Sequence, residues 1–122
     1  MLMNDFYTIE YIQRDPNSVA CKVSFNSQHD IFKGHFPNTP VVPGVCMMEM
    51  VKELLEQQTD QPLWMRDAGQ VKFLQLITPD ISPVIVINWE KNKQGYNVNA
   101  AFKNDINDLF KLSGSFEPSY KH

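Results

Sequence analysis

One long apolar helix constrains this chain more than any other feature. The helix is predicted to begin at Pro43-Gly44 and to run to about residue 58, because the proline at position 62 disfavours helix in the residue before it. At about 100° per residue, a very wide arc is apolar: Cys46, Met47, Met48, Met50, Val51, Leu54 and Leu55. The narrow remaining sector holds Glu49, Lys52, Glu53 and Glu56, together with Val45. A helix this apolar is predicted to be mostly buried, as it would be inside a curved sheet.

The other segments predict β-strands. They are rich in β-branched and aromatic residues, or they alternate apolar with polar residues, and turn chemistry separates them. The expected strands span residues 6–12, 19–25, 71–77, 84–91, 96–103 and 109–116, and residues 26–43 are expected to be irregular. Two strands, one helix and then about four strands indicate an α+β domain in which an antiparallel sheet packs on the helix.

Length and charge exclude several classes of protein. A chain of 122 residues with 43% hydrophobic residues suits one folded domain spanning residues 1–122. Its formal net charge of -3 argues against a nucleic-acid partner, since such proteins usually carry a basic excess. No targeting or membrane-spanning segment is recognised, so we expect a cytoplasmic protein with no membrane partner. Cys21 and Cys46 fit free thiols in a reducing compartment.

Few side chains are candidates for chemistry. His122 ends the sequence, and His35 lies in a loop between glycine and aromatic residues. A lone histidine in an apolar loop is more often structural, so the loop context favours a structural role for His35. Helical periodicity alone favours reading Glu49 as part of the polar side of the helix. His29 and His35 are too loosely spaced to indicate a metal site, so none is expected. Cys46 is typical of a small hydrophobic residue, although a place in the first helical turn would lower its pKa and favour a nucleophile.

The start of the helix is a further candidate site. Gly44 lets a ligand approach the bare N–H groups of the first turn, where the helix dipole is positive. Such N–H groups are suited to holding a thioester or amide carbonyl oxygen. The alternative is that a proline at or near the first helical position is common for conformational reasons alone.

A compound motif around the helix start resembles a known family. Gly34-His35-Phe36-Pro37, then Pro40-Val41-Val42-Pro43-Gly44-Val45, and then Glu49 are similar to the motif of the 3-hydroxyacyl-acyl-carrier-protein dehydratases, which have the hotdog fold. Weaker similarity extends over most of the chain, and residues 31–49 are its specific part.

The resemblance implies a fold and a site. An antiparallel sheet would wrap around one long central helix, and two subunits would join edge to edge with active sites at their interface. His35 of one subunit would take the proton α to a thioester, and Glu49 of the other would protonate the leaving hydroxyl group. The Gly44 N–H would stabilise charge on the thioester oxygen. The residues implied to bind substrate are Gly44, Val45, Phe36 and Val41.

The implied reaction is the dehydration of (3R)-3-hydroxyacyl thioesters on acyl carrier protein to trans-2-enoyl thioesters, in fatty-acid or related lipid or polyketide biosynthesis. It requires no metal and no cofactor of the enzyme's own, because the phosphopantetheine arm belongs to the carrier. The implied partners are therefore the acyl carrier protein and a second copy of the chain, as a homodimer or an assembly of dimers. Lys22, Lys33, Arg66 and Lys72 would form a docking patch for the acidic carrier if the fold gathered them.

Two features depart from the family pattern and keep other functions open. Glu53 stands where the family usually has glutamine, and the sequence begins after the segment that typically helps to cover the acyl tunnel. One alternative is a hotdog thioesterase, in which Glu49 would activate water. The other is a non-catalytic acyl-binding or scaffold protein.

Overall fold

The computed structural model describes residues 1–33 and 39–119. Six strands form one sheet, and every neighbouring pair in it is antiparallel. The elements in chain order are β1 (Tyr7–Asp15), β2 (Ser18–Phe25), α1 (Asp30–Lys33), α2 (Gly44–Thr59), β3 (Leu63–Phe73), β4 (Val84–Lys91), β5 (Tyr96–Lys103) and β6 (Asp108–Pro118). The α+β architecture predicted from the sequence is therefore the one observed.

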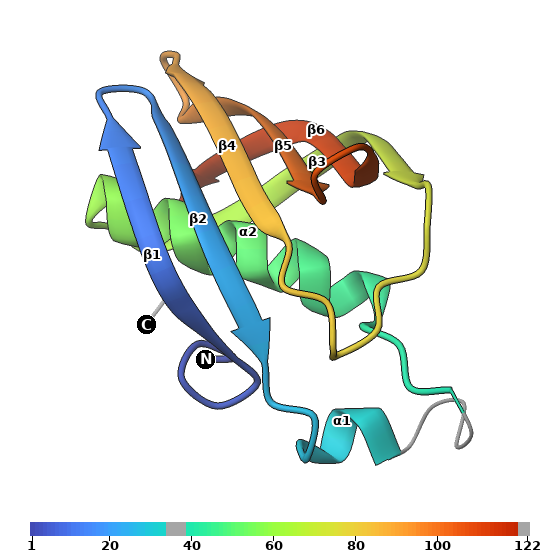
Figure 1. The fold of residues 1–122 in the computed structure, drawn as a ribbon. Helices are drawn as coiled ribbons and strands as arrows, with labels where there is room; N and C mark the ends of the chain where they lie inside the picture. The colour runs from blue at the N-terminus through green and yellow to red at the C-terminus, as the bar shows by residue number, and fades with distance from the viewer. Residues whose placement is uncertain (34–38, 120–122) are drawn as a thin grey trace.

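The sheet curves over helix α2, which lies along its concave face (Figure 1). The strand order is β1-β2-β4-β5-β6-β3, so β1 and β3 are the two edges. The first hairpin closes where turn chemistry predicted it, with Asp15 opposite Ser18. Strand β3 returns from the helix to pair with β6, and the ladder between them is bulged twice, at Met65/Asp67 and at Ala68/Gln70.

The wide apolar arc of α2 forms the centre of the core. Met50, Val51, Leu54 and Leu55 are fully buried against the sheet. Burying such a side chain stabilises the fold by about 2 kcal/mol, so these four positions hold the helix in the sheet. The helix ends at Thr59, and the left-handed backbone of the next residue, Asp60 (φ 54°, ψ 42°), stops it before the proline at position 62.

Most expected strands are confirmed, and one strand, β3, was placed wrongly at both ends. Strands β4 and β5 have the expected bounds, and β1, β2 and β6 differ by a few residues. Strand β3 begins at Leu63 rather than at residue 71 and ends at Phe73 rather than at 77. Its first half, WMRDAGQ, lacks β-branched residues and clean alternation, and pairing with β6 makes it a strand. The segment expected to be irregular contains the short helix α1.

Candidate functional site

Helix α2 begins with N–H groups that the helix itself cannot satisfy. Pro43 precedes the helix in an extended conformation (φ −65°, ψ 146°), and its carbonyl accepts from Cys46 N at 3.0 Å and Met47 N at 3.2 Å. Gly44 and Val45 have no such backbone acceptor within the described part of the chain. Their N–H groups lie at the positive end of a 16-residue helix, which is a favourable place for an oxygen carrying negative charge.

Gly44 lies directly beneath the ring of Phe73, at the end of β3. A Cβ atom built on Gly44 would stand 2.5 Å from Cε1 and 2.7 Å from Cζ of that ring, so a side chain here would displace it. The two residues belong to a groove of about 340 Å³, whose other walls are mostly apolar. The remaining lining residues are Val41, Val42, Met47, Leu74, Gln75, Leu76 and Ile77. The arrangement suits an acyl or pantetheine chain that brings a carbonyl to the helix start.

Glu49 lies just over one helical turn further along α2. Its side chain is 40% exposed, and Oε2 lies 3.5 Å from Nζ of Lys52. Burial of the carboxyl raises the pKa of Glu49 above its usual range, and the neighbouring Glu53 carboxyl raises this pKa further. Lys52 opposes both effects, and the net direction is upward. A carboxyl with a raised pKa keeps its proton to a higher pH than an ordinary glutamate does.

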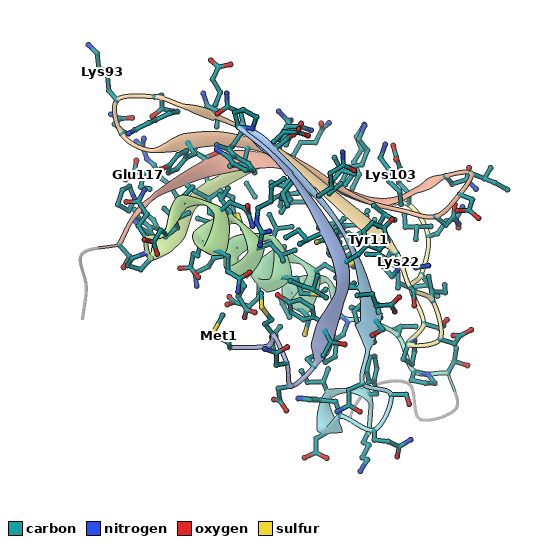
Figure 2. The ribbon with its side chains drawn as sticks, turned by 60° about the vertical axis from the view of Figure 1, so that its left-hand side comes forward. Met1, Tyr11, Lys22, Lys93, Lys103 and Glu117 are labelled. Atoms are coloured by element: carbon teal, nitrogen blue, oxygen red, sulfur yellow. The ribbon has the colours of Figure 1, made fainter. Side chains whose placement is uncertain are left out.

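Glu53 is the charged residue that sequence analysis placed wrongly. The predicted polar sector included it, yet its side chain is only 1% exposed. Its Oε2 accepts from Leu2 N at 2.8 Å, and its Oε1 accepts from Met3 N at 2.9 Å and from the Tyr7 hydroxyl at 3.1 Å. The N-terminal loop thus folds back onto the helix, and Figure 2 shows Met1 beside α2. These three hydrogen bonds allow a carboxylate to be buried here.

Replacing Tyr7 with phenylalanine is expected to lower the free energy of unfolding by about 1 kcal/mol. The hydroxyl is fully buried and donates to Glu53, so its removal leaves that carboxylate with one donor fewer. Denaturant-induced unfolding measures the loss. Tyr11→Phe on the same strand is the matched control, because Tyr11 is 55% exposed and should cost nothing measurable. Equal losses in the two variants would show that the Tyr7 hydroxyl does not support this network.

The structure brings together some of the residues predicted for the site. Gly44 and Val41 line the same groove, with Val41 itself buried. Val45 is not among the residues that line the groove and is 74% exposed. His35 and Phe36 lie outside the described residues. Phe73 was not singled out from the sequence, since it was expected to lie inside a strand rather than at its end over Gly44.

Other predicted chemistry finds less support. His29 Nδ1 accepts from Ile31 N at 3.1 Å, so its Nε2 carries the proton toward Asp5, also at 3.1 Å. Both ring nitrogens are therefore engaged in structural bonds. Burial raises the pKa of the Cys46 thiol, which is the reverse of the shift that a nucleophile needs. Both cysteines are free and buried.

The described residues contain neither a metal-binding cluster nor a membrane-spanning helix. Within residues 1–33 and 39–119, no three His, Cys, Asp or Glu side chains converge in a way that would hold a metal ion. No helix in that part of the chain has the length and apolar character needed to cross a membrane.

The fold is that of a hotdog protein, and two solved structures share it. The dehydratase heterocomplex ApeI:P from Xenorhabdus doucetiae superposes with a TM-score of 0.76 at 17% identity, over 89% of this chain and 96% of that one. An uncharacterized protein from Erwinia carotovora subsp. atroseptica superposes with a TM-score of 0.74 at 18% identity, over 94% and 98% of the two chains. The hotdog fold expected from the motif is thereby confirmed.

The sequence identifies the family more narrowly. Residues 11–110 match the ApeI-like family, described as ApeI dehydratase, and the chain belongs to this family. A 3-hydroxyacyl-acyl-carrier-protein dehydratase FabZ from Levilactobacillus brevis is 27% identical over 88 residues, which are 66% of this chain and 58% of the relative. The FabZ of Clostridium acetobutylicum is 43% identical over 47 residues, or 38% and 32% of the two chains. The chain therefore spans little more than half of the first relative and a third of the second.

Proposed function

We propose that the protein dehydrates (3R)-3-hydroxyacyl thioesters on acyl carrier protein to trans-2-enoyl thioesters. The observation that carries the proposal is the start of α2, where Gly44 lines an apolar groove and Glu49, whose pKa is raised by burial, lies just over one turn further along the same helix. Membership of the ApeI-like dehydratase family and the FabZ relatives supports this reaction class and a substrate linked to a carrier protein. Two free thiols fit a cytoplasmic location.

The proposed chemistry divides the work between two groups. Neutral His35 takes the proton α to the thioester, and the electron pair of that C–H bond forms the new double bond. The C–O bond at the β-carbon breaks, and the departing hydroxyl receives the proton of Glu49 and leaves as water. Return of the proton from the imidazolium to the carboxylate, directly or through water, restores both groups. While the proton is being removed, negative charge gathers on the thioester oxygen, and the N–H of Gly44 stabilises it. One such donor typically stabilises the transition state by about 3 kcal/mol.

We propose that a second subunit completes the site, with His35 from one copy and Glu49 from the other. Strand β3 supports this arrangement, because it is an edge of the sheet and carries an exposed tryptophan, Trp64. Phe73, Leu74 and Leu76, at and beyond the end of β3, are 61%, 49% and 74% exposed. A row of large apolar side chains beside an open sheet edge is typical of a surface that another chain covers.

The four basic residues considered as a docking patch for the carrier lie on three separate elements. Lys22 lies on β2, Lys33 on α1, and Arg66 and Lys72 on β3. Strands β2 and β3 are separated by three others in the sheet. Lys33 and Arg66 are also paired with carboxylates, Asp30 and Glu117 respectively. The fold therefore does not gather these four residues into one patch.

The proposal is tested with purified protein and two thioester substrates on acyl carrier protein. A (3R)-3-hydroxyacyl thioester should lose one water by mass and gain the ultraviolet absorbance of an enoyl thioester. A saturated acyl thioester of equal length should stay intact. Release of free carrier thiol from the saturated substrate would identify a thioesterase instead. If neither substrate reacted, the result would favour a non-catalytic binding or scaffold protein.

A further inference from the structure

The ring of Phe73 lies beside the N–H group that is proposed to hold the thioester oxygen. Its Cε1 and Cζ atoms would stand 2.5 and 2.7 Å from a Cβ atom on Gly44. Because a Cβ is about 2.5 Å from the nitrogen of its own residue, the edge of the ring is at most about 5 Å from the Gly44 nitrogen. An oxygen that accepts from this N–H would lie about 2.9 Å from the same nitrogen. The ring and a thioester bound here would therefore be close neighbours.

Two buried rings hold the ring of Phe73 in place. Its centroid is 5.2 Å from that of Phe110, and Phe110 is 5.4 Å from Phe102 in an edge-to-face contact. Phe102 and Phe110 are fully buried and lie opposite each other on β5 and β6. The chain after Phe73 is fixed as well, because the next two N–H groups donate to the carbonyl of Leu109 at 3.0 and 3.1 Å. The ring is thus an anchored wall.

The same ring is one wall of the groove at the helix start. Phe73 remains 61% exposed despite its contacts, and it lines the groove of about 340 Å³ together with Gly44. Met47 and Ile77, on other walls, are only 4% and 1% exposed and belong to the packed core, which resists displacement. A second copy along β3, as proposed above, would close the groove further and would not widen it. The space beside Gly44 is therefore limited by the ring.

We propose that Phe73 is a specificity-determining residue, whose ring favours acyl thioesters with an unbranched α-carbon over those that carry a methyl branch there. The inference rests on the proposed function of the helix start as the thioester site. When the Gly44 N–H holds the oxygen, the α-carbon is two bonds from that oxygen and shares the space beside the ring. Non-bonded carbon atoms pack at about 3.5–4.0 Å. A methyl branch would therefore press on the ring or pull the oxygen away from its donor.

The test compares the binding of two saturated thioesters that cannot be dehydrated, hexanoyl-pantetheine and 2-methylhexanoyl-pantetheine, by calorimetric titration. Wild type should bind the unbranched thioester about 10- to 100-fold more tightly, the usual effect of one methyl group in a tight pocket. In Phe73→Ala the ratio should fall to near one, because the branch takes the place of the ring. Phe73→Leu should give an intermediate ratio, and it decides the question if Phe73→Ala does not fold.

The matched control is Leu76→Ala. Leu76 lines the same groove and is 74% exposed, but it is not among the atoms that crowd Gly44. Both thioesters should lose affinity equally in this variant, so the ratio between them should stay as in wild type. A wild-type ratio near one, or a ratio that the substitutions of Phe73 leave unchanged, would overturn the inference. Failure of wild type to bind either thioester would overturn it as well.

Gly44→Ala gives an independent check, since alanine keeps the N–H and adds a Cβ that displaces the ring. The loss of hexanoyl-pantetheine binding should be much smaller when Gly44→Ala is made in Phe73→Ala, where the clashing ring is absent. Equal losses in the two backgrounds would show that the ring does not limit this space.

Turnover separates this inference from the proposed function. Rates with unbranched and 2-methyl-branched 3-hydroxyacyl thioesters on acyl carrier protein are measured below the alkaline limb of the pH–rate profile, where Glu49 keeps its proton. The kcat/KM ratio should follow the binding ratio in wild type and in Phe73→Ala. Absence of turnover with the binding preference intact would refute the proposed reaction and leave the role of Phe73 supported.

Discussion

Replacing Glu49 with glutamine is expected to lower kcat by about 10²- to 10⁴-fold, the usual contribution of a general acid. The leaving hydroxyl needs a proton as the C–O bond breaks, and a neutral amide is far too weak an acid to supply it. The fold should be preserved, because glutamine has nearly the same shape. Among the described residues, Glu49 pairs only with Lys52, and a partly exposed pair of this kind contributes about 0.5 kcal/mol.

The matched control for Glu49→Gln is Glu56→Gln. Glu56 lies on the same helix, shares Lys52, and uses Oε2 to accept from Leu63 N at 2.8 Å, a bond that the glutamine oxygen is able to keep. Steady-state assays at a pH below the alkaline limb should therefore give near-normal kcat for Glu56→Gln. Comparable losses in the two variants would show that any charge change on α2 disturbs the enzyme, and the role of Glu49 as acid would be abandoned.

The same substitution also tests whether two subunits share the site. His35→Ala and Glu49→Gln should each be inactive as homodimers. A heterodimer purified through two different affinity tags combines one intact His35 with one intact Glu49 at a single interface, so about half of its sites should work. Failure to recover activity in the heterodimer would place both groups in one subunit, or place them in no common site.

The sequence predicted the central helix well because its signals are local. An apolar arc with a proline after its end needs no knowledge of the rest of the chain. The first half of β3 was missed because its strand character comes from pairing with β6, which the segment itself does not encode. The burial of Glu53 was missed for a related reason. Its partners, Leu2, Met3 and Tyr7, lie about fifty residues away in the chain, and two of them contribute only backbone N–H groups.

The candidate site was predictable in part for the same physical reasons. Gly44 and Glu49 stand out by their place on one helix, where spacing fixes their relation to the helix start. Phe73 does not stand out, because nothing in its neighbourhood shows that β3 ends there and that its ring covers Gly44. Long-range packing decides which strand residue meets which helix residue, and a single sequence contains no direct signal for it.

Gly114→Ala is expected to lower the free energy of unfolding by about 3 kcal/mol, the upper part of the range for overpacking. Gly114 lies on β6 opposite Ala68, between the two bulges of the β3–β6 ladder. A Cβ here would stand 2.5 Å from the carbonyl oxygen of Asp67 and 3.3 Å from the Cα of Ala68. Both contacts are with backbone, so relief requires moving β3 itself rather than turning a side chain.

Gly69→Ala, on the facing strand of the same ladder, provides the control for Gly114→Ala. The nearest atom to its added Cβ is the Ser113 carbonyl oxygen at 3.6 Å, an ordinary contact. Replacing this glycine should therefore leave stability unchanged, or raise it by about 0.5 kcal/mol through the lower entropy of the unfolded chain. Denaturant unfolding at one protein concentration compares the two, since a dimer makes the midpoint depend on concentration. If Gly114→Ala proved as stable as Gly69→Ala, β3 would have room to move away from β6, and the close backbone approach at Gly114 would not constrain the ladder.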